Sequence, residues 1–507
     1  MAGKIEQAEL ALTESVAQTD QALSALDRVV DGKENAGGLP REWSDINLES
    51  LAKFIDYRGR TPTKTADGIP LITAKNIRDG FINREPREFI AEEDYDDWMT
   101  RGIPRLGDVV ITTEAPMGNV ARIDISEKFA LAQRSICLYL YNQEMSGYLF
   151  YALRSPEFIE KLGMNSTGTT VKGIKSGTLK KLEIPLPPLA EQTVIAQTLD
   201  ILLAQVDNIK TRLDAIPNIL KTFRQSVLAA AVSGKLTEEW RGDNECEAVF
   251  PDMEGLTEFK QKTLGVLPLT WKWERFDTVA EIASNLEDPM LDPQAFHIAP
   301  NHIESKTGRL LEYTTIENDN VKSNKHRFFA GQILYSKIRP YLAKVALADF
   351  TGMCSADMYP VNSKIDRDYL FRWMLTGAFT DWASNAESRS VLPKINQKDL
   401  SRIPVPTPPI EEQTEIVRRV EELFAFADQI EQQVKNAQGR VNNLTQSILA
   451  KAFRGELTTQ WRAENPALIS GENSAEALLA KIQKERAAVK QKAKPKKKST
   501  RKKSVNK

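Results

Sequence analysis

The stretch PPLAEQTVIAQTLD occupies residues 187–200, and a close copy, PPIEEQTEIVRRVE, occupies residues 408–421. Shifting the chain by the same 221 positions aligns residues 184–196 with residues 405–417, with seven of thirteen positions identical. The shift also aligns LAAAVSGKLTEEWR with LAKAFRGELTTQWR, with eight of fourteen identical. Because no gap separates the two matches, the chain contains two copies of one unit whose rear part has a fixed length.

Both rear parts carry apolar residues at alternating spacings of four and three, which is typical of the seam of a heptad coiled coil. The first seam is Ile195, Leu199, Leu202, Val206, Ile209, Leu213, Ile216, Leu220, Phe223 and Val227. The second, in the same register, is Ile416, Val420, Leu423, Ala427, Ile430, Val434, Ala437, Val441, Leu444 and Ile448. We therefore predict two long helices that pair antiparallel; the alternative is that the heptads only dimerise the protein.

The ends of these helices are marked by residues that suit helix termini. Pro-Pro pairs at 187–188 and 408–409 suit a first turn, and Gly234 and Gly455 suit a C-terminal cap. Each long helix of about 43 residues, rising 1.5 Å per residue, would be roughly 65 Å long. Pro217 lies inside the first helix and predicts a kink or a break, with Gly439 near the equivalent place in the second.

The front parts resemble each other less than the rear parts do. LPREW at Leu39 aligns with LPLTW at Leu267, and GDVVITTEAP at Gly107 aligns with GQILYSKIRP at Gly331, but the offset drifts to 228 and then 224. Short alternating strands such as VVITT, SICLYLY and ILYSKI are mixed with turn residues and short helices. We predict an α+β fold with two pseudo-repeated heads separated by two long antiparallel coiled-coil helices.

The expected organisation follows from these boundaries. It comprises a helical N-terminal extension (1–38), the first head (39–183), the first long helix (184–241), a linker (242–266), the second head (267–404), the second long helix (405–462), a C-terminal helix (463–489) and a basic disordered tail (490–507).

Composition and charge narrow the class of protein. The 507 residues are 41% hydrophobic and 27% charged, as in a globular protein of more than one domain. Three distant cysteines offer no disulfide framework and fit a reducing cytoplasm, and no segment has the pattern of a signal peptide or a membrane span.

The tail from residue 490 holds ten of the 68 Lys and Arg and no acid, which leaves 58 basic against 69 acidic residues, or a net charge of −11, in the rest of the chain. A uniformly basic DNA binder is excluded, so cations for DNA must be gathered in patches.

Both heads contain polar and basic clusters of the residue types that base edges and phosphates require. In the first head these candidates for DNA binding are Arg58, Arg60, Thr61, Lys64, Lys75, Asn76, Arg78, Arg134, Thr169, Thr170, Lys172 and Lys175. In the second head they are Asn301, His302, Lys306, Lys322, Lys325, His326, Arg327, Lys337, Arg339, Arg389, Ser390, Lys394 and Asn396. Each one taken singly has the alternative of being an ordinary solvated surface residue.

Motifs for catalysis are missing from the sequence. There is no GxxxxGK[ST] loop for a nucleoside triphosphate, no GxGxxG after a strand, and no aromatic after either Pro-Pro pair to stack a flipped base. His297, His302, His326 and Cys354 all fall in the second head, but without HxxxH or CxxC spacing, so we expect no metal site and no catalytic residues. The sequence favours a binding protein over an enzyme that acts alone on DNA or a coiled-coil tether.

Two heads that each end in PLPPLAEQ or PTPPIEEQ, followed by a long helix and by SGKLTEEWR or RGELTTQWR, resemble the specificity subunit of type I restriction-modification enzymes. The resemblance covers residues 39 to 462. It implies that each head is a target recognition domain reading one half of a bipartite site in double-stranded DNA, and that the paired helices set the spacer. It also implies docking of two methyltransferase subunits that bring S-adenosylmethionine, and of ATP- and Mg-dependent restriction subunits that translocate and cut.

Overall fold

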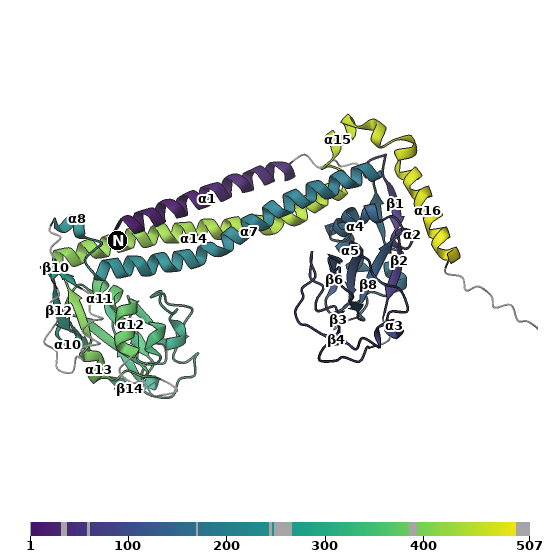
Figure 1. The fold of residues 1–507 in the computed structure, drawn as a ribbon. Helices are drawn as coiled ribbons and strands as arrows, with labels where there is room; N and C mark the ends of the chain where they lie inside the picture. Colours follow the sequence, from purple (N-terminus) through teal and green to yellow (C-terminus); the bar gives the residue numbers. More distant parts are fainter. Residues whose placement is uncertain are drawn as a thin grey trace, which may run out of the picture. The chain divides into compact units, whose positions relative to one another are not determined.

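A computed structural model describes most of the chain (Figure 1). The described residues are 2–31, 38–57, 61–168, 171–242, 246–247, 266–384 and 393–492. They divide into two compact units, Thr19–Arg212 with Ala437–Lys507, and Met1–Gln18 with Leu213–Asn436. The boundaries fall inside the three helices α1 (Ala2–Val30), α7 (Leu189–Val232) and α14 (Ile410–Phe453). Each unit therefore contains one head and one half of each long helix.

The first head is built on a four-stranded antiparallel sheet in the order β2-β8-β5-β6. A second sheet, β4-β3-β7, pairs β3 and β7 in parallel, and β1 pairs with β9 where the head joins α7. The strands are β1 (Ser44–Asn47), β2 (Ala52–Asp56), β3 (Ile69–Ile72), β4 (Phe89–Ile90), β5 (Val109–Thr113), β6 (Met117–Arg122), β7 (Ala130–Leu131), β8 (Ser135–Leu140) and β9 (Glu183–Leu186). The helices are α2 (Leu48–Leu51), α3 (Tyr95–Trp98), α4 (Ser146–Ala152), α5 (Pro156–Met164) and α6 (Ser176–Leu179).

The second head repeats this plan although its sequence differs. Its main sheet has the order β13-β21-β18-β19, and the parallel pair β15-β20 corresponds to β3-β7. Its strands are β11 (Leu267–Pro268), β12 (Lys272–Arg275), β13 (Ala280–Ile282), β14 (Leu286–Glu287), β15 (Phe296–Ile298), β16 (Thr314–Thr315), β17 (Lys325–Phe328), β18 (Gln332–Ser336), β19 (Val345–Ala348), β20 (Gly352–Cys354), β21 (Met358–Ser363) and β22 (Pro404–Thr407). Its helices are α10 (Phe276–Val279), α11 (Arg367–Met374), α12 (Gly377–Ser384) and α13 (Gln397–Ser401). The predicted α+β pseudo-repeat is confirmed, and β14 with β17 is an addition of the second head.

The long helices are paired antiparallel, as the heptad seams predict. In one unit Arg224 of α7 forms ion pairs of 2.6 Å with Asp428 and 3.1 Å with Glu431 of α14, whereas Arg419, nearer the start of α14, donates at 2.8 Å to the carbonyl oxygen of Leu236, beyond the end of α7. Every seam residue is buried except Leu202 and Leu423, which are half-buried and are separated by the repeat distance. Of the kink or break expected at Pro217, the break is wrong, because α7 runs through it as one helix of 44 residues.

The repeated motifs meet in two buried junctions, one in each unit. In the Glu412 junction (Trp271, Glu412, Thr237 and Arg241), one carboxylate accepts hydrogen bonds from the indole at 2.9 Å and from the hydroxyl and the guanidinium at 2.6 Å each. The Glu191 junction (Trp43, Glu191, Thr458 and Arg462) has the same three bonds. Each junction thus ties the start of a head and of its long helix to the rear motif of the other copy.

The glutamine that follows each of these glutamates also has a structural role. Gln192 donates to the carbonyl oxygen of Pro187, and Gln413 to that of Pro408, both at 2.8 Å. A first-turn side chain that bonds back to the preceding residues fixes the angle at which the chain enters the helix. The motif PPLxEQ therefore encodes the connection between head and helix.

The end of α1 and the helix near the C-terminus both pack within the unit that contains the first head. Lys451 of α14 donates to the carbonyl oxygens of Val29 and Val30 at the end of α1, at 2.7 and 3.2 Å. The helix α16 (Ala475–Lys492) follows Ser474, whose hydroxyl oxygen accepts from the amide of Ala477 at 3.2 Å, and its Arg486 pairs with Glu49 of the first head at 3.0 Å. The short segments α8 (Glu238–Arg241), β10 (Cys246–Glu247) and α15 (Thr459–Glu464) complete the α-helices and strands of the described residues, beside several single turns of 3-10 helix. The basic tail from residue 493 lies outside the described residues. All helices in the described ranges are too short or too polar to cross a membrane.

Candidate nucleic-acid interface

The first head gathers four of its predicted DNA-binding residues around one hollow. The hollow has a volume of about 230 Å³, and its lining includes Thr61, Lys64, Lys75 and Arg134. All four side chains are exposed. Lys64 pairs with Glu88 at 2.7 Å. These residues come from three separate loops, so the fold brings together cations that are up to 70 residues apart in the chain.

The other candidates of the first head differ in what they can do. Asn76 is a correction, because its side chain is buried and bonds to Thr73, to the carbonyl oxygen of Asn83 and to that of Pro86. A side chain whose donors and acceptor are all used within the loop cannot read a base edge. Arg78, Lys172 and Lys175 are exposed, and Lys175 stands directly before α6. Arg58, Arg60, Thr169 and Thr170 lie outside the described residues.

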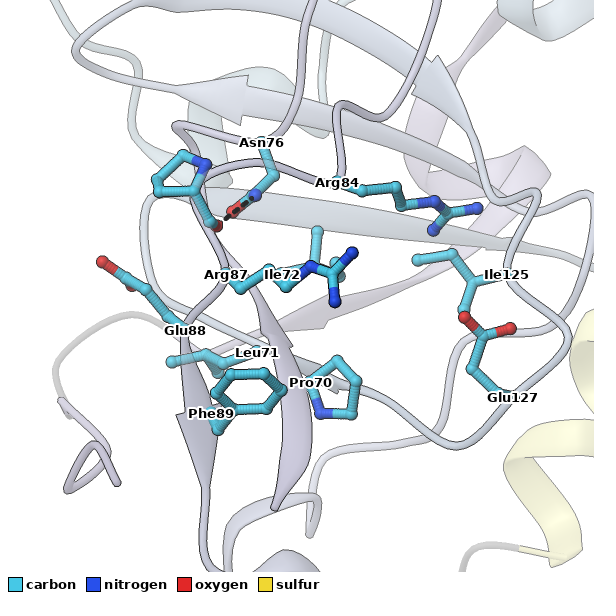
Figure 2. A pocket seen from close by; sticks show the side chains of 11 residues that line it. Pro70, Leu71, Ile72, Asn76, Arg84, Arg87, Glu88, Phe89, Ile125 and Glu127 are labelled. Carbon is cyan, nitrogen blue, oxygen red and sulfur yellow. Dashed lines mark hydrogen bonds between the residues drawn. The ribbon is translucent and has the colours of Figure 1, made fainter. Parts of the chain in front are cut away.

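A second cleft of the first head contains arginines that the sequence did not single out. Figure 2 shows Arg84 and Arg87 directed over a cleft of about 270 Å³, with Asn76 bonded to Pro86 at its edge. Arg84 is paired with Asp124 at 3.1 Å and Arg87 with Glu85 at 3.0 Å. Because each cation already faces an acid, this cleft has no excess of positive charge for phosphate.

The second head places Lys337, Arg339 and Lys394 at the end of β18. An isolated bridge between Ile338 and Lys394 joins the two segments, and the amide of Arg339 donates to the carbonyl oxygen of Pro393 at 2.8 Å. Lys394 pairs with Asp357 at 3.2 Å, and the ammonium of Lys337 lies 5.2 Å from the ring centre of Tyr359. The end of this strand is the part of the second head where predicted residues from distant segments converge.

Three residues of the strand β17 are corrections to the predicted interface. Lys325 and His326 are buried, Lys325 bonds to Ser323, and the Nδ1 of His326 lies 2.9 Å from the carbonyl oxygen of Asn285. Burial lowers the pKa of both side chains. Arg327 is held by Glu287 and Asp292 at 2.8 and 3.3 Å, which raises its pKa. These side chains stabilise the added strand.

The remaining candidates of the second head lie on its surface. Asn301, Lys306 and Lys322 are exposed, and His302 is half-buried. Asn396 is exposed but caps α13 by accepting from the amide of Asp399 at 2.8 Å. Arg389 and Ser390 lie outside the described residues.

The histidines that raised the question of a metal are partly brought together. Among the residues that the structure describes, His297, His302 and Asp319 offer ligand atoms within 4.8 Å of one another. The Nδ1 of His297 already lies 2.7 Å from a carboxylate oxygen of Asp319, and the Nδ1 of His302 faces the backbone at 3.1 Å. Cys354 is a buried free thiol on β20 opposite His326, where burial raises its pKa. The Nδ1 atoms of both histidines are thus engaged in hydrogen bonds, whereas the Nε2 of His297 is buried without a hydrogen-bond partner in the described part of the chain.

Comparison with known proteins gives the family. The model of the type I restriction modification DNA specificity domain matches residues 40–218 and 298–437. The chain belongs to this family. It is 62% identical over 342 residues to the EcoDI specificity subunit of Escherichia coli, covering 67% of this chain and 77% of that one. It is 35% identical to the EcoKI specificity subunit of Escherichia coli strain K12, over 90% of this chain and 97% of that one.

Solved structures agree with the fold of a specificity subunit. The HsdS subunit of Thermoanaerobacter tengcongensis covers 83% of this chain and 99% of its own, with a TM-score of 0.52 and 19% identity. A chain from a study of assembly and conformational transition in a type I system covers 83% of this chain and all of its own, with a TM-score of 0.57 and 19% identity. The chain is a specificity subunit of a type I restriction-modification system.

Proposed function

We propose that each head of this specificity subunit reads one half of a bipartite site in double-stranded DNA, and that the two long helices set the length of the unread spacer. The observation that carries the proposal is that both heads share one strand order while the charged residues at the end of the central strand differ. A shared scaffold with different reading residues is what two unlike half-sites require.

Methylation and cleavage would be carried out by other subunits, because this sequence lacks motifs that bind nucleotides or methylate bases. We propose that the chain docks two methyltransferase subunits, which bring S-adenosylmethionine, and restriction subunits that use ATP and magnesium for translocation and cleavage. The names of the relatives support a role beside such subunits. A bacterial cytoplasm is the compartment in which such a complex meets its DNA.

The first experiment maps methylated adenines across a genome in cells that receive this chain with a compatible methyltransferase subunit, against cells with the methyltransferase alone. The expected result is a two-part motif with a constant gap that appears only when this chain is present. Methylation or cleavage by the isolated chain would instead support an independent enzyme. Normal activity after neutralisation of all the predicted DNA-binding loops, with the long helices intact, would support a coiled-coil tether.

A further inference from the structure

The central strands β5 and β18 end in the same backbone contact in the two heads. The residue whose carbonyl oxygen accepts the hydrogen bond is a cation in the first head and an acid in the second. The amide of Thr113, at the end of β5, donates to the carbonyl oxygen of Arg134 at 2.9 Å. The amide of Lys337, just beyond β18, donates to the carbonyl oxygen of Asp357, also at 2.9 Å. Arg134 in one head therefore occupies the backbone position that Asp357 occupies in the other.

The corner is closed by a third segment in the same way in each head. Glu114 forms an isolated bridge with Gly173, and Ile338 forms one with Lys394. Gly173 and Lys394 are 221 residues apart, which is the repeat distance, and each lies shortly before a helix, α6 or α13. We define the strand-end corner as residues 113–115, 134 and 173 in the first head, and 337–339, 357 and 394 in the second.

Each strand-end corner presents one half-exposed ion pair. In the first head Arg134 lies 3.1 Å from Glu114, with 53% and 45% of the side chains exposed. In the second head Lys394 lies 3.2 Å from Asp357, with 51% and 42% exposed. The two ion pairs thus have similar exposure and similar distances. The cation and the acid, however, come from different segments of the corner in the two heads.

Stability does not account for these pairs. An exposed ion pair contributes little to the free energy of folding, too little to explain why both heads place one at the same corner. The corner also contains unfavourable backbone: Arg134 has φ of 70°, Ala115 46° and Arg339 48°. Left-handed conformations of non-glycine residues are uncommon and concentrate at functional sites.

A cation beside a carboxylate is chemically matched to the edge of a G·C pair. In the major groove guanine presents two acceptors, N7 and O6, and the paired cytosine presents an amino donor. Arg or Lys donates to guanine, and Asp or Glu accepts from cytosine. The acid also cancels the charge of the cation, which limits attraction to phosphates at the wrong sequence.

We infer that the strand-end corner is the base-reading element of each head, and that Arg134 with Glu114, and Lys394 with Asp357, each recognise a G·C pair in their own half-site. This inference rests on the proposed function and names the residues that carry it. The ion pair within the protein is exchanged for hydrogen bonds to the two bases when DNA binds.

The test measures binding of the chain, in complex with its methyltransferase partner, to duplexes that carry every single base change in the recognised site. Arg134→Ala should weaken binding to the cognate duplex roughly ten- to hundred-fold and remove discrimination at one base pair of one half-site. Glu114→Gln should weaken selection of that same pair, because an amide both donates and accepts. Lys394→Ala and Asp357→Asn should act only on the other half-site.

Two controls separate base reading from other roles. Arg84→Ala removes an arginine whose ion pair with Asp124 has comparable exposure (43% and 60%), and it should leave every base preference unchanged. Arg134→Lys keeps the charge but not the two-pronged donor, so base discrimination should fall while the salt dependence of binding stays as in the wild type. Melting temperatures confirm that each variant is folded.

The outcomes distinguish failure of the proposed function from failure of the inference about the strand-end corner. If the wild-type complex has no sequence preference, the proposed function fails. If the wild type reads a bipartite site and the corner variants keep all its preferences, or weaken all sequences equally with a reduced salt slope, the inference about the strand-end corner is overturned and these side chains are phosphate contacts or bystanders.

Discussion

At the residue scale, the identities that repeat in the sequence are explained by two buried carboxylates. Glu191 and Glu412 have 0% and 1% of the side chain exposed, and each satisfies an indole, a hydroxyl and an arginine. A buried charge is tolerated only when it is paired and fully hydrogen-bonded, so all four members of a junction are required together. This is the physical reason that W, EQ and LTxxWR recur at fixed distances.

Replacing Glu412 with alanine should lower the free energy of unfolding by about 3–5 kcal/mol, because the buried ion pair with Arg241 is broken and the donors of Trp271 and Thr237 lose their acceptor. Denaturant unfolding followed by tryptophan fluorescence measures the change. Glu411→Ala is the matched control, since the adjacent side chain is exposed and its loss should change stability by less than about 0.5 kcal/mol. Equal effects of the two substitutions would show that the junction does not stabilise the fold.

Histidines give the second head a pH dependence that the first head lacks, because all three lie in the second. Burial lowers the pKa of His326, with Lys337 adding to the effect, and burial outweighs Asp319 in lowering that of His297. Below about pH 6.5 these histidines bind protons more readily in the unfolded chain than in the folded protein. The free energy of unfolding is therefore highest above that pH and decreases as the pH falls below it. The slope approaches at most about 1.4 kcal/mol per pH unit for each histidine.

Thermal unfolding at pH 7.5 and 5.5 tests this dependence. The melting temperature of the second head should fall between the two pH values, and His326→Gln should reduce the fall by removing one titrating group. A fall of the same size in the variant would assign the pH dependence to other residues.

At the element scale, the long helices carry two local defects that packing tolerates. Pro217 is exposed and lacks the amide that would bond to the carbonyl oxygen of Leu213, yet α7 continues through it because Ile216 and Leu220 on either side are buried in the seam. Local propensity predicted a break at this proline. Tertiary packing prevails, since burial of a seam residue is worth about 1.5–3 kcal/mol and several surround the defect.

Gly439→Ala in α14 should stabilise the protein by about 0.5–1 kcal/mol. The glycine is exposed, it lies within the helix, and an added Cβ would meet no atom within 4 Å. Calorimetric melting detects the gain. Gly455→Ala is the contrasting variant, because its φ is 79° and a Cβ would approach Pro40 to 2.3 Å, so it should destabilise. A loss of stability in Gly439→Ala would mean that the helix is strained at this position.

At the scale of the whole molecule, the sequence predicted the architecture better than the interface. The heptad periodicity and the internal repeat each depend on many residues at once, and they predicted the paired helices and the duplicated heads. Within the first seam, Leu202 alone is less buried than expected. Candidate DNA residues were chosen by type, which does not separate Lys75 on the surface from Asn76 in the interior. The acids of the strand-end corner were missed because the candidates were limited to the cations, amides and hydroxyls that bind phosphates and base edges; Glu114 lies in the aligned stretch GDVVITTEAP, whereas Asp357 lies outside the alignment with GQILYSKIRP.

Shortening both long helices by one heptad tests whether their length sets the spacer. Removing residues 210–216 and 437–443 keeps each seam in phase and shortens each helix by about 10 Å, or roughly three base pairs of DNA at 3.4 Å each. Methylome mapping should then show both half-sites unchanged and the gap reduced by about three base pairs. Methylation should be slower, because three base pairs also turn one half-site by about 100° around the DNA axis and the duplex must untwist to compensate. An unchanged gap would show that the helices hold the heads without measuring the distance between the half-sites.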